Sequence, residues 1–215
     1  MAFEGFPAAA FSFYERLETN NTRDFWNANK REYQQYVREP MIALADELED
    51  EFGPATVFRP NRDIRFSPDK SPYKTYQGMF VERLPGTGLY AQISADGILV
   101  SGGFHSHSAD QVERYRLAVD AAPSGAALAD IVAGLGEHGL SVGGDQLKTR
   151  PRGVRPDHPR IELLRYRSLT ASRNWAAGPD LAGRPVLDLI RQDWQRLIPL
   201  CDWLEKHVGA PKPPG

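Results

Sequence analysis

The chain of 215 residues has very little cysteine, only Cys201. One cysteine cannot form a disulfide within the chain, and it excludes a cysteine-rich zinc site. Apolar runs are also short, and none approaches the roughly 18 residues that a membrane span needs. The N-terminal segment reaches Glu4 and Glu15 early and lacks the basic start and long apolar run of a signal peptide. These absences predict a cytoplasmic protein with no membrane partner.

Fingerprints of common nucleotide and hydrolase sites are missing as well. The chain has no GxxxxGK[ST] phosphate loop, and no GxGxxG motif opens a helix. It has no GxSxG motif and no evident nucleophile paired with a base. His105 and His107 form an HxH pair, but a zinc site needs a third and usually a fourth ligand, and no further residue has ligand spacing. We therefore predict no metal site, and the sequence leaves the cofactor unknown.

Charge, by contrast, is unevenly distributed along a chain whose net charge is only −2. Residues 1–56 carry five basic and eleven acidic side chains, residues 58–78 carry five and two, and residues 146–168 carry seven and two. Like charges repel, so they are held together only where something negative neutralises them. The two basic segments therefore predict either an anionic ligand or pairing with the acidic N-terminal helices.

Hydrophobic spacing predicts an α+β fold. Helical periodicity covers residues 7–18, 22–53, 108–122, 124–139 and 184–208, with a shorter helix at 158–165. Pro40 is expected to break or kink the second helix, and Pro199 to kink the last. Apolar alternation between turns at Pro85-Gly86 and Asp96-Gly97 predicts an antiparallel meander over 76–104. Gly102-Gly103 predicts a bulge or a close approach to the backbone.

These elements predict one domain over residues 1–215, with a mostly antiparallel sheet flanked by N-terminal and C-terminal helices. Segments near 140–149 and 168–175 are expected to join the meander in one sheet. Cys201 lies on the apolar face of the last helix and is expected to be a packed hydrophobe. The tail, residues 210–215, is expected to be disordered.

The segment RPNRDIRFSPDKSPYK, residues 59–74, is the first candidate for a binding site. Arginine matches carboxylate or phosphate with two parallel hydrogen bonds, and the turns around Pro68 and Pro72 offer backbone N–H groups beside hydroxyls. Asp63 stands between arginines, so it ionises easily and suits orienting an arginine better than acting as a general base. The predicted ligand-binding residues are Arg59, Arg62, Asp63, Arg65, Lys70, Ser71, Tyr73 and Lys74.

The second basic segment supplies three further candidates, Lys148, Arg152 and His158. We expect at least one of them to lie opposite the first segment across a single pocket. His158 is either a general acid–base or an ordinary loop histidine.

The first segment also resembles a known family. Arg59, Arg62-Asp63, Arg65-Phe66, Asp69-Lys70 and Tyr73 reproduce in order the RxxRDxRFxxDKxxY signature of the bacterial and fungal domain of unknown function 2461. The resemblance extends to the N-terminal helices, the central hairpin and the segment LKTRPRGVRPDHPRIELLRYRSL. It implies that the charged motif is a feature of the family, which has no established activity.

Binding of a small anionic ligand that bears phosphate or carboxylate is the leading hypothesis. The alternative is a hydrolase or transferase acting on such a ligand, with Asp63, Tyr73, Lys70 and His158 as candidate catalytic residues. Nucleic-acid binding is disfavoured, because the isoelectric point is near 6.2. The arginines could also form a purely structural clasp. The oligomeric state cannot be predicted.

Overall fold

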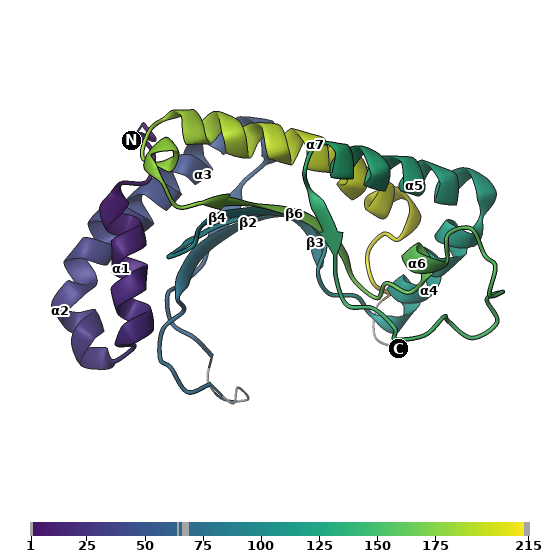
Figure 1. Cartoon of the computed structure of the whole chain (residues 1–215), viewed down its shortest axis with the longest axis horizontal. Coiled ribbons are helices and arrows are strands. Elements are labelled where there is room, and N and C mark those ends of the chain that lie inside the picture. Colours follow the sequence, from purple (N-terminus) through teal and green to yellow (C-terminus); the bar gives the residue numbers. More distant parts are fainter. Residues whose placement is uncertain (1, 64, 66–68, 213–215) are drawn as a thin grey trace. The chain divides into compact units, whose positions relative to one another are not determined.

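The computed structural model describes residues 2–63, 65 and 69–212 (Figure 1). The chain divides into two compact units, each assembled from three segments. Unit 1 comprises Met1–Val81, Tyr90–Val100 and Asn174–Gln192, and unit 2 comprises Glu82–Leu89, Ser101–Arg173 and Asp193–Gly215. The predicted single domain is not tested by this division and stays a prediction.

Unit 1 begins with helices α1 (Ala8–Thr19) and α2 (Arg23–Tyr33), which pack on one another. The predicted start of the second helix is confirmed, because the Thr22 hydroxyl accepts a hydrogen bond from the Phe25 amide at 3.2 Å. This N-cap satisfies one of the amides that a helix start leaves without an intrahelical partner.

Pro40 does not interrupt the helical path. A π-helical turn, η1 (Gln34–Arg38), stands directly before it, and α3 (Glu39–Phe52) continues from there. A proline in a helix clashes with the carbonyl four residues earlier, here that of Tyr36. A π-helical turn has wider hydrogen bonding, so it relieves this clash without ending the helix. The predicted break or kink is therefore a change of helix type.

Six strands of the described residues form one antiparallel sheet in the order β1-β2-β3-β4-β6-β5. Its strands are β1 (Ala55–Val57), β2 (Tyr76–Leu84), β3 (Thr87–Ser94), β4 (Gly97–Phe104), β5 (Ser141–Gly143) and β6 (Leu169–Ala176). Ala55 pairs with Val81 at one edge, and Ser141 pairs with Ser172 at the other. The α+β class, the meander and the single sheet are confirmed.

Two glycines show why the meander can form. Gly86 in the first turn has φ +82°, in the region that favours glycine. Gly103 has φ +123°, and a Cβ there would lie 2.3 Å from the Leu169 carbonyl oxygen. The predicted close approach at Gly102-Gly103 is therefore confirmed, with β6 as the approaching strand.

Unit 2 contains helices α4 (Ala109–Asp120), α5 (Ala122–Glu137) and the short α6 (Ile161–Leu164). Two predicted elements were too long. The strand over 140–149 is only β5, because Gly144 takes φ +139° and leaves the ladder. The helix over 158–165 is only α6, because a residue that precedes proline, as His158 does, avoids the helical conformation.

The C-terminal part of the chain has a 3-10 turn, η2 (Pro179–Leu181), and the long helix α7 (Pro185–His207), which runs through Pro199. Cys201 is fully buried, with its Sγ 3.8 Å from the Gly88 carbonyl oxygen. Burial raises the pKa of this thiol to about 12. Cys201 is therefore a packed apolar residue, as predicted.

The tail is described as far as Lys212. Arg114 Nη2 donates to the Ala210 carbonyl at 2.7 Å, and the Lys212 amide donates to Asp110 Oδ2 at 3.1 Å. Residues 213–215 lie outside the described residues, so disorder of the tail stays a prediction. No single helix in the described ranges is long and apolar enough to cross a membrane, and only α4 and α5 pass as a pair, bent by 94°.

Candidate functional site

The first basic segment forms a paired arm in unit 1, which we call the basic arm (residues 58–63, 65 and 69–78). The Arg62 amide donates to the Pro72 carbonyl at 3.0 Å, and the Lys74 amide donates to the Pro60 carbonyl at 2.8 Å. An antiparallel bridge joins Asn61 and Tyr73 between these two bonds. Side chains alternate along paired strands, so Arg62 and Lys74 share the face opposite to Tyr73. Ile64 and Phe66–Pro68 lie outside the described residues.

Asn21 and Trp26 hold the basic arm against α2 and the turn that precedes it. The Asn21 side chain donates to the Tyr73 carbonyl at 2.9 Å and accepts from the Tyr73 amide at 3.2 Å. The Tyr73 ring stacks on Trp26 with a centroid distance of 4.1 Å and an interplanar angle of 10°. Tyr73 is only 7% exposed. These contacts of Tyr73 are structural, and its predicted part in ligand binding stays a prediction.

Gln77 fixes the base of the arm. It is buried, and its Nε2 donates to the Phe58 carbonyl at 2.8 Å and to the Gly78 carbonyl at 3.0 Å. Its Oε1 accepts from the Tyr33 hydroxyl. A buried amide with partners on both sides is strongly oriented. The backbone on both sides of the arm is therefore anchored where the arm leaves the sheet.

The two aspartates of the arm bind side chains and backbone of the arm itself. Asp63 binds Arg65 through both oxygens, with Nε at 3.0 Å and Nη2 at 2.6 Å. Asp69 accepts from the Ser71 amide at 2.9 Å and hydroxyl at 2.6 Å, and it pairs with Arg62. Hydrogen bonds from Arg65 lower the pKa of Asp63, and those from Ser71 lower the pKa of Asp69. Both carboxylates are held ionised, which fits the expected role of Asp63 in orienting an arginine.

Two acidic residues of α3 form ion pairs with arginines outside the basic arm. Glu47 binds Arg184 of unit 1 at 2.7 Å, and Glu51 binds Arg191 at 3.2 Å. The clasp hypothesis expects the acidic residues near the end of α3 to pair with the arginines of the arm, and these two ion pairs do not support it.

Three cations of the arm remain close together. Burial first, and then the charges of Arg59 and Arg62, lower the pKa of the half-buried Lys74. Arg62 Nε is buried and has no hydrogen-bond partner among the described residues. Arg59 is exposed, and its charge acts on Asp63, which binds Arg65. Asp69 pairs with Arg62, so two carboxylates among the described residues of the arm face Arg59, Arg62, Arg65 and Lys74, and the positive charge around Lys74 is incompletely neutralised.

Aromatic rings border these cations. Lys74 Nζ lies 5.1 Å from the Phe58 ring centroid and 6.0 Å from that of Tyr76. The Phe58 and Tyr90 rings are 6.2 Å apart. All three rings are half-buried, so each presents part of its surface to solvent.

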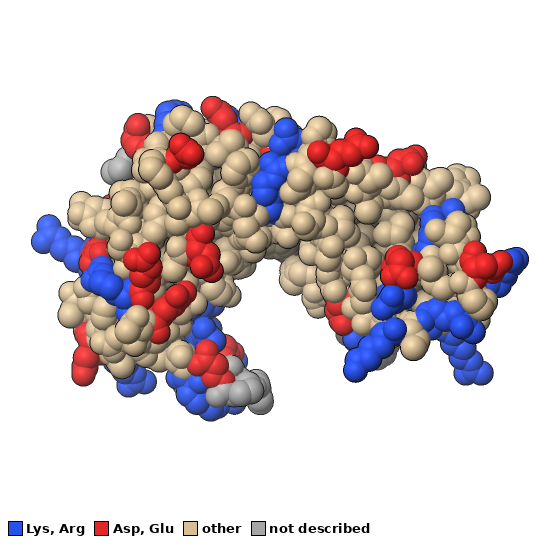
Figure 2. All heavy atoms as spheres, viewed as in Figure 1, with Lys and Arg blue, Asp and Glu red and all other residues tan. Residues whose placement is uncertain are grey.

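The second basic segment contributes to a cavity in unit 2. The cavity has a volume of about 570 Å³, and its lining from α4 and from the loop before α6 includes Arg116, Arg152, Arg155 and His158. Figure 2 shows Lys and Arg side chains gathered over this part of unit 2. Arg116 was missed by the sequence reasoning, because it lies in a helix whose periodicity explains its neighbours.

Each ring nitrogen of His158 has a polar partner. Nδ1 accepts from the Arg160 amide at 3.1 Å, which places the proton on Nε2 in the neutral ring. Nε2 lies 3.1 Å from Asp120 Oδ1. Both nitrogens hold backbone or side-chain partners, so this geometry favours the loop-histidine interpretation over a general acid–base.

A neighbouring cavity of about 500 Å³ contains the HxH pair. His107 Nδ1 bonds the Arg167 carbonyl at 3.2 Å, and burial lowers the pKa of His107 to about 4. Among the described residues, no group of three His, Cys, Asp or Glu side chains could hold a metal ion.

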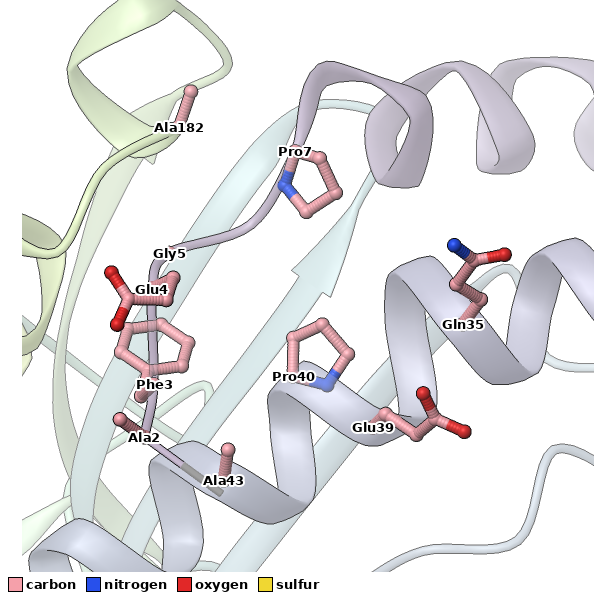
Figure 3. A pocket seen from close by; sticks show the side chains of 10 residues that line it. All are labelled: Ala2, Phe3, Glu4, Gly5, Pro7, Gln35, Glu39, Pro40, Ala43 and Ala182. Carbon is pink, nitrogen blue, oxygen red and sulfur yellow. The ribbon is translucent and has the colours of Figure 1, made fainter.

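A third cavity, of about 280 Å³, lies in unit 1 beside η1 (Figure 3). Its polar side chains are Glu4, Gln35 and Glu39, and the rest of its lining is apolar or glycine. Without a cationic side chain, this cavity does not suit an anion.

The structure thus gathers the first set of predicted residues in unit 1 and places Lys148, Arg152 and His158 in unit 2. Lys148 and Arg152 are exposed, and Arg152 lines the 570 Å³ cavity. The expectation that the two sets lie across a single pocket stays a prediction.

Comparison with known proteins supports the resemblance seen in the motif. A search of curated proteins finds no match to the chain. A family model described as a conserved hypothetical protein, DUF2461, matches residues 9–203 and so includes α1, the basic arm, the whole sheet and most of α7. The chain belongs to the DUF2461 family of conserved hypothetical proteins.

Proposed function

We propose that the basic arm binds a small anionic ligand that carries phosphate or carboxylate. The observation that carries this proposal is the group Arg59, Arg62 and Lys74, in which burial and then the charges of the two arginines lower the pKa of Lys74. Holding like charges together costs free energy, and an anion would offset that cost. Arg62 Nε is a buried donor that has no hydrogen-bond partner among the residues that the structure describes, and a ligand oxygen is a suitable acceptor.

Binding is better supported than catalysis. Of the candidate catalytic residues, Asp63 is held ionised by Arg65, and Tyr73 is buried against Trp26. His158 already has a partner on each ring nitrogen. A general base needs a lone pair within reach of the substrate. The Arg160 amide occupies the Nδ1 lone pair of His158, and both oxygens of Asp63 accept from Arg65. A hydrolase or transferase activity, a nucleic-acid ligand and a cytoplasmic location remain hypotheses from the sequence.

The test is a thermal-shift titration of the full chain with inorganic phosphate, pyrophosphate and citrate. We expect at least one of them to raise the melting temperature in a saturable way, because a ligand that binds only the native state stabilises it. Arg62→Ala should abolish that rise while the unliganded chain stays folded.

Lys206→Ala is the control, because it also removes one positive charge, from an exposed position on α7. The proposal fails if Lys206→Ala and Arg62→Ala weaken the response equally, or if none of the three anions produces one.

A further inference from the structure

The geometry points to a nucleoside phosphate as the ligand of the basic arm, with its base against the rings of Phe58, Tyr76 and Tyr90. This inference rests on the proposed function and narrows it to one ligand class. Lys74 is close to both kinds of group: its Nζ lies within 6.0 Å of the Phe58 and Tyr76 ring centroids, and Arg59 and Arg62 are its neighbouring cations.

An inorganic anion would use only half of this surface. Arg59, Arg62 and Lys74 suit phosphate oxygens, but the half-buried rings of Phe58 and Tyr76 beside Lys74 suit an aromatic group. Every nucleobase has a π face, and stacking on aromatic side chains contributes substantially to nucleotide binding. A nucleotide presents base and phosphate within one small molecule, so it would contact both halves together.

The rings come from three different places and are held firmly. Phe58 stands at the base of the arm, where its carbonyl accepts from the buried Gln77. Tyr76 begins β2, and Tyr90 lies in β3. The Tyr90 hydroxyl donates to Gln92 Oε1 at 2.6 Å, which fixes the position of that ring.

Gly78 contributes through its missing side chain. A Cβ at this position would lie 2.5 Å from the Tyr90 hydroxyl oxygen and 2.9 Å from two ring carbons. Only glycine therefore lets Tyr90 lie across β2 in its present position, 6.2 Å from Phe58. Gly78 therefore allows the Tyr90 ring to lie near Phe58, whose ring is in turn beside Lys74.

The experiment compares the four nucleoside diphosphates with pyrophosphate by calorimetric titration of the full chain. We expect at least one nucleoside diphosphate to bind about tenfold more tightly than pyrophosphate, the lower part of the range for stacking on an aromatic side chain. Phe58→Leu keeps the apolar bulk but removes the flat ring. It should weaken nucleotide binding more than it weakens pyrophosphate binding, because pyrophosphate has no base to stack on the ring.

Phe25→Leu is the matched control, because Phe25 is also half-buried and has Arg16 at 5.8 Å from its ring. It should change neither affinity. If Phe58→Leu does not fold, Tyr76→Leu replaces it. Saturation-transfer NMR on the wild-type chain provides a second measurement, in which base protons should receive more saturation than ribose protons.

The outcomes separate the two proposals. Equal affinity for pyrophosphate and all four nucleotides, lost in Arg62→Ala, would overturn the nucleotide assignment and leave anion binding standing. Tighter binding of an eight-residue oligothymidine than of any mononucleotide would also overturn it, because it would indicate that the ligand is single-stranded nucleic acid. Absence of binding by every phosphate compound and by citrate would overturn both.

Discussion

Asn21 offers a sharp test of how the basic arm is held. Its side-chain amide makes two hydrogen bonds with the backbone of Tyr73, 52 residues away, at 2.9 Å and 3.2 Å. Each such bond contributes about 0.5–1.5 kcal/mol net, so Asn21→Ala should weaken the attachment of the arm by about 1–3 kcal/mol. Opening of the arm should then be about 5–150 times more frequent.

Native-state hydrogen exchange followed by NMR measures this opening directly. The Tyr73 amide donates to Asn21 Oδ1, so its exchange reports on the contact that is removed. In Asn21→Ala the Tyr73 amide should exchange faster by the factor above. Asn21→Asp keeps the acceptor for the Tyr73 amide but places a carboxylate oxygen against the Tyr73 carbonyl, so it should also weaken the attachment of the arm.

Asn27→Ala serves as the control, because Asn27 is an exposed residue of α2 and alanine favours helix. Exchange at Tyr73 should be unchanged in this variant. If Asn21→Ala folds and leaves Tyr73 exchange within twofold of wild type, other contacts of the arm, such as the stack of Tyr73 on Trp26, hold it without Asn21 and our reasoning is wrong. If the reasoning holds, Asn21→Ala should also weaken anion binding, although Asn21 is not one of the proposed ligand-binding residues.

Two further predictions concern titrating groups. Burial and the neighbouring arginines lower the pKa of Lys74 from its ordinary value of 10.5. The rise in melting temperature that an anion produces should therefore decline as the pH rises through that lowered pKa. Lys74→Arg should move this decline to higher pH in the thermal-shift titration. In the ligand-free protein the sign is opposite, because folding disfavours the charged form and stability due to Lys74 rises with pH up to about 10.5. The Cys201 thiol, with a pKa of about 12, should resist a thiol reagent in the native chain and react only on unfolding, while Cys201→Ala should cost about 1 kcal/mol in urea denaturation. Rapid labelling of the native chain would show that the apolar face of α7 is misassigned.

Local pattern alone determined most of the secondary structure. Helical spacing identified α1 and α7, and the turns at Gly86 and Gly97 identified the meander, because these signals depend only on residues close in sequence. The errors in length came from backbone effects that periodicity does not capture, such as the conformation of Gly144 and the proline that follows His158.

The order of the strands in the sheet depends on tertiary contacts. Nothing in the sequence says that β6 pairs beside β4 and separates it from β5, since pairing depends on which surfaces meet once the chain has collapsed. The same holds for the π-helical turn, which is one of several ways in which a chain can accommodate Pro40.

The sequence by itself identified the charged motif, because unusual density of arginine and lysine is visible without a structure. Only the tertiary structure separated its members by role. Tyr73 is fixed by Asn21 and Trp26, residues some 50 positions away, while Arg59, Arg62 and Lys74 stay together with incomplete neutralisation. The physical reason is that burial and partnership are set by contacts between distant segments, and one-dimensional spacing carries no record of which segments will meet.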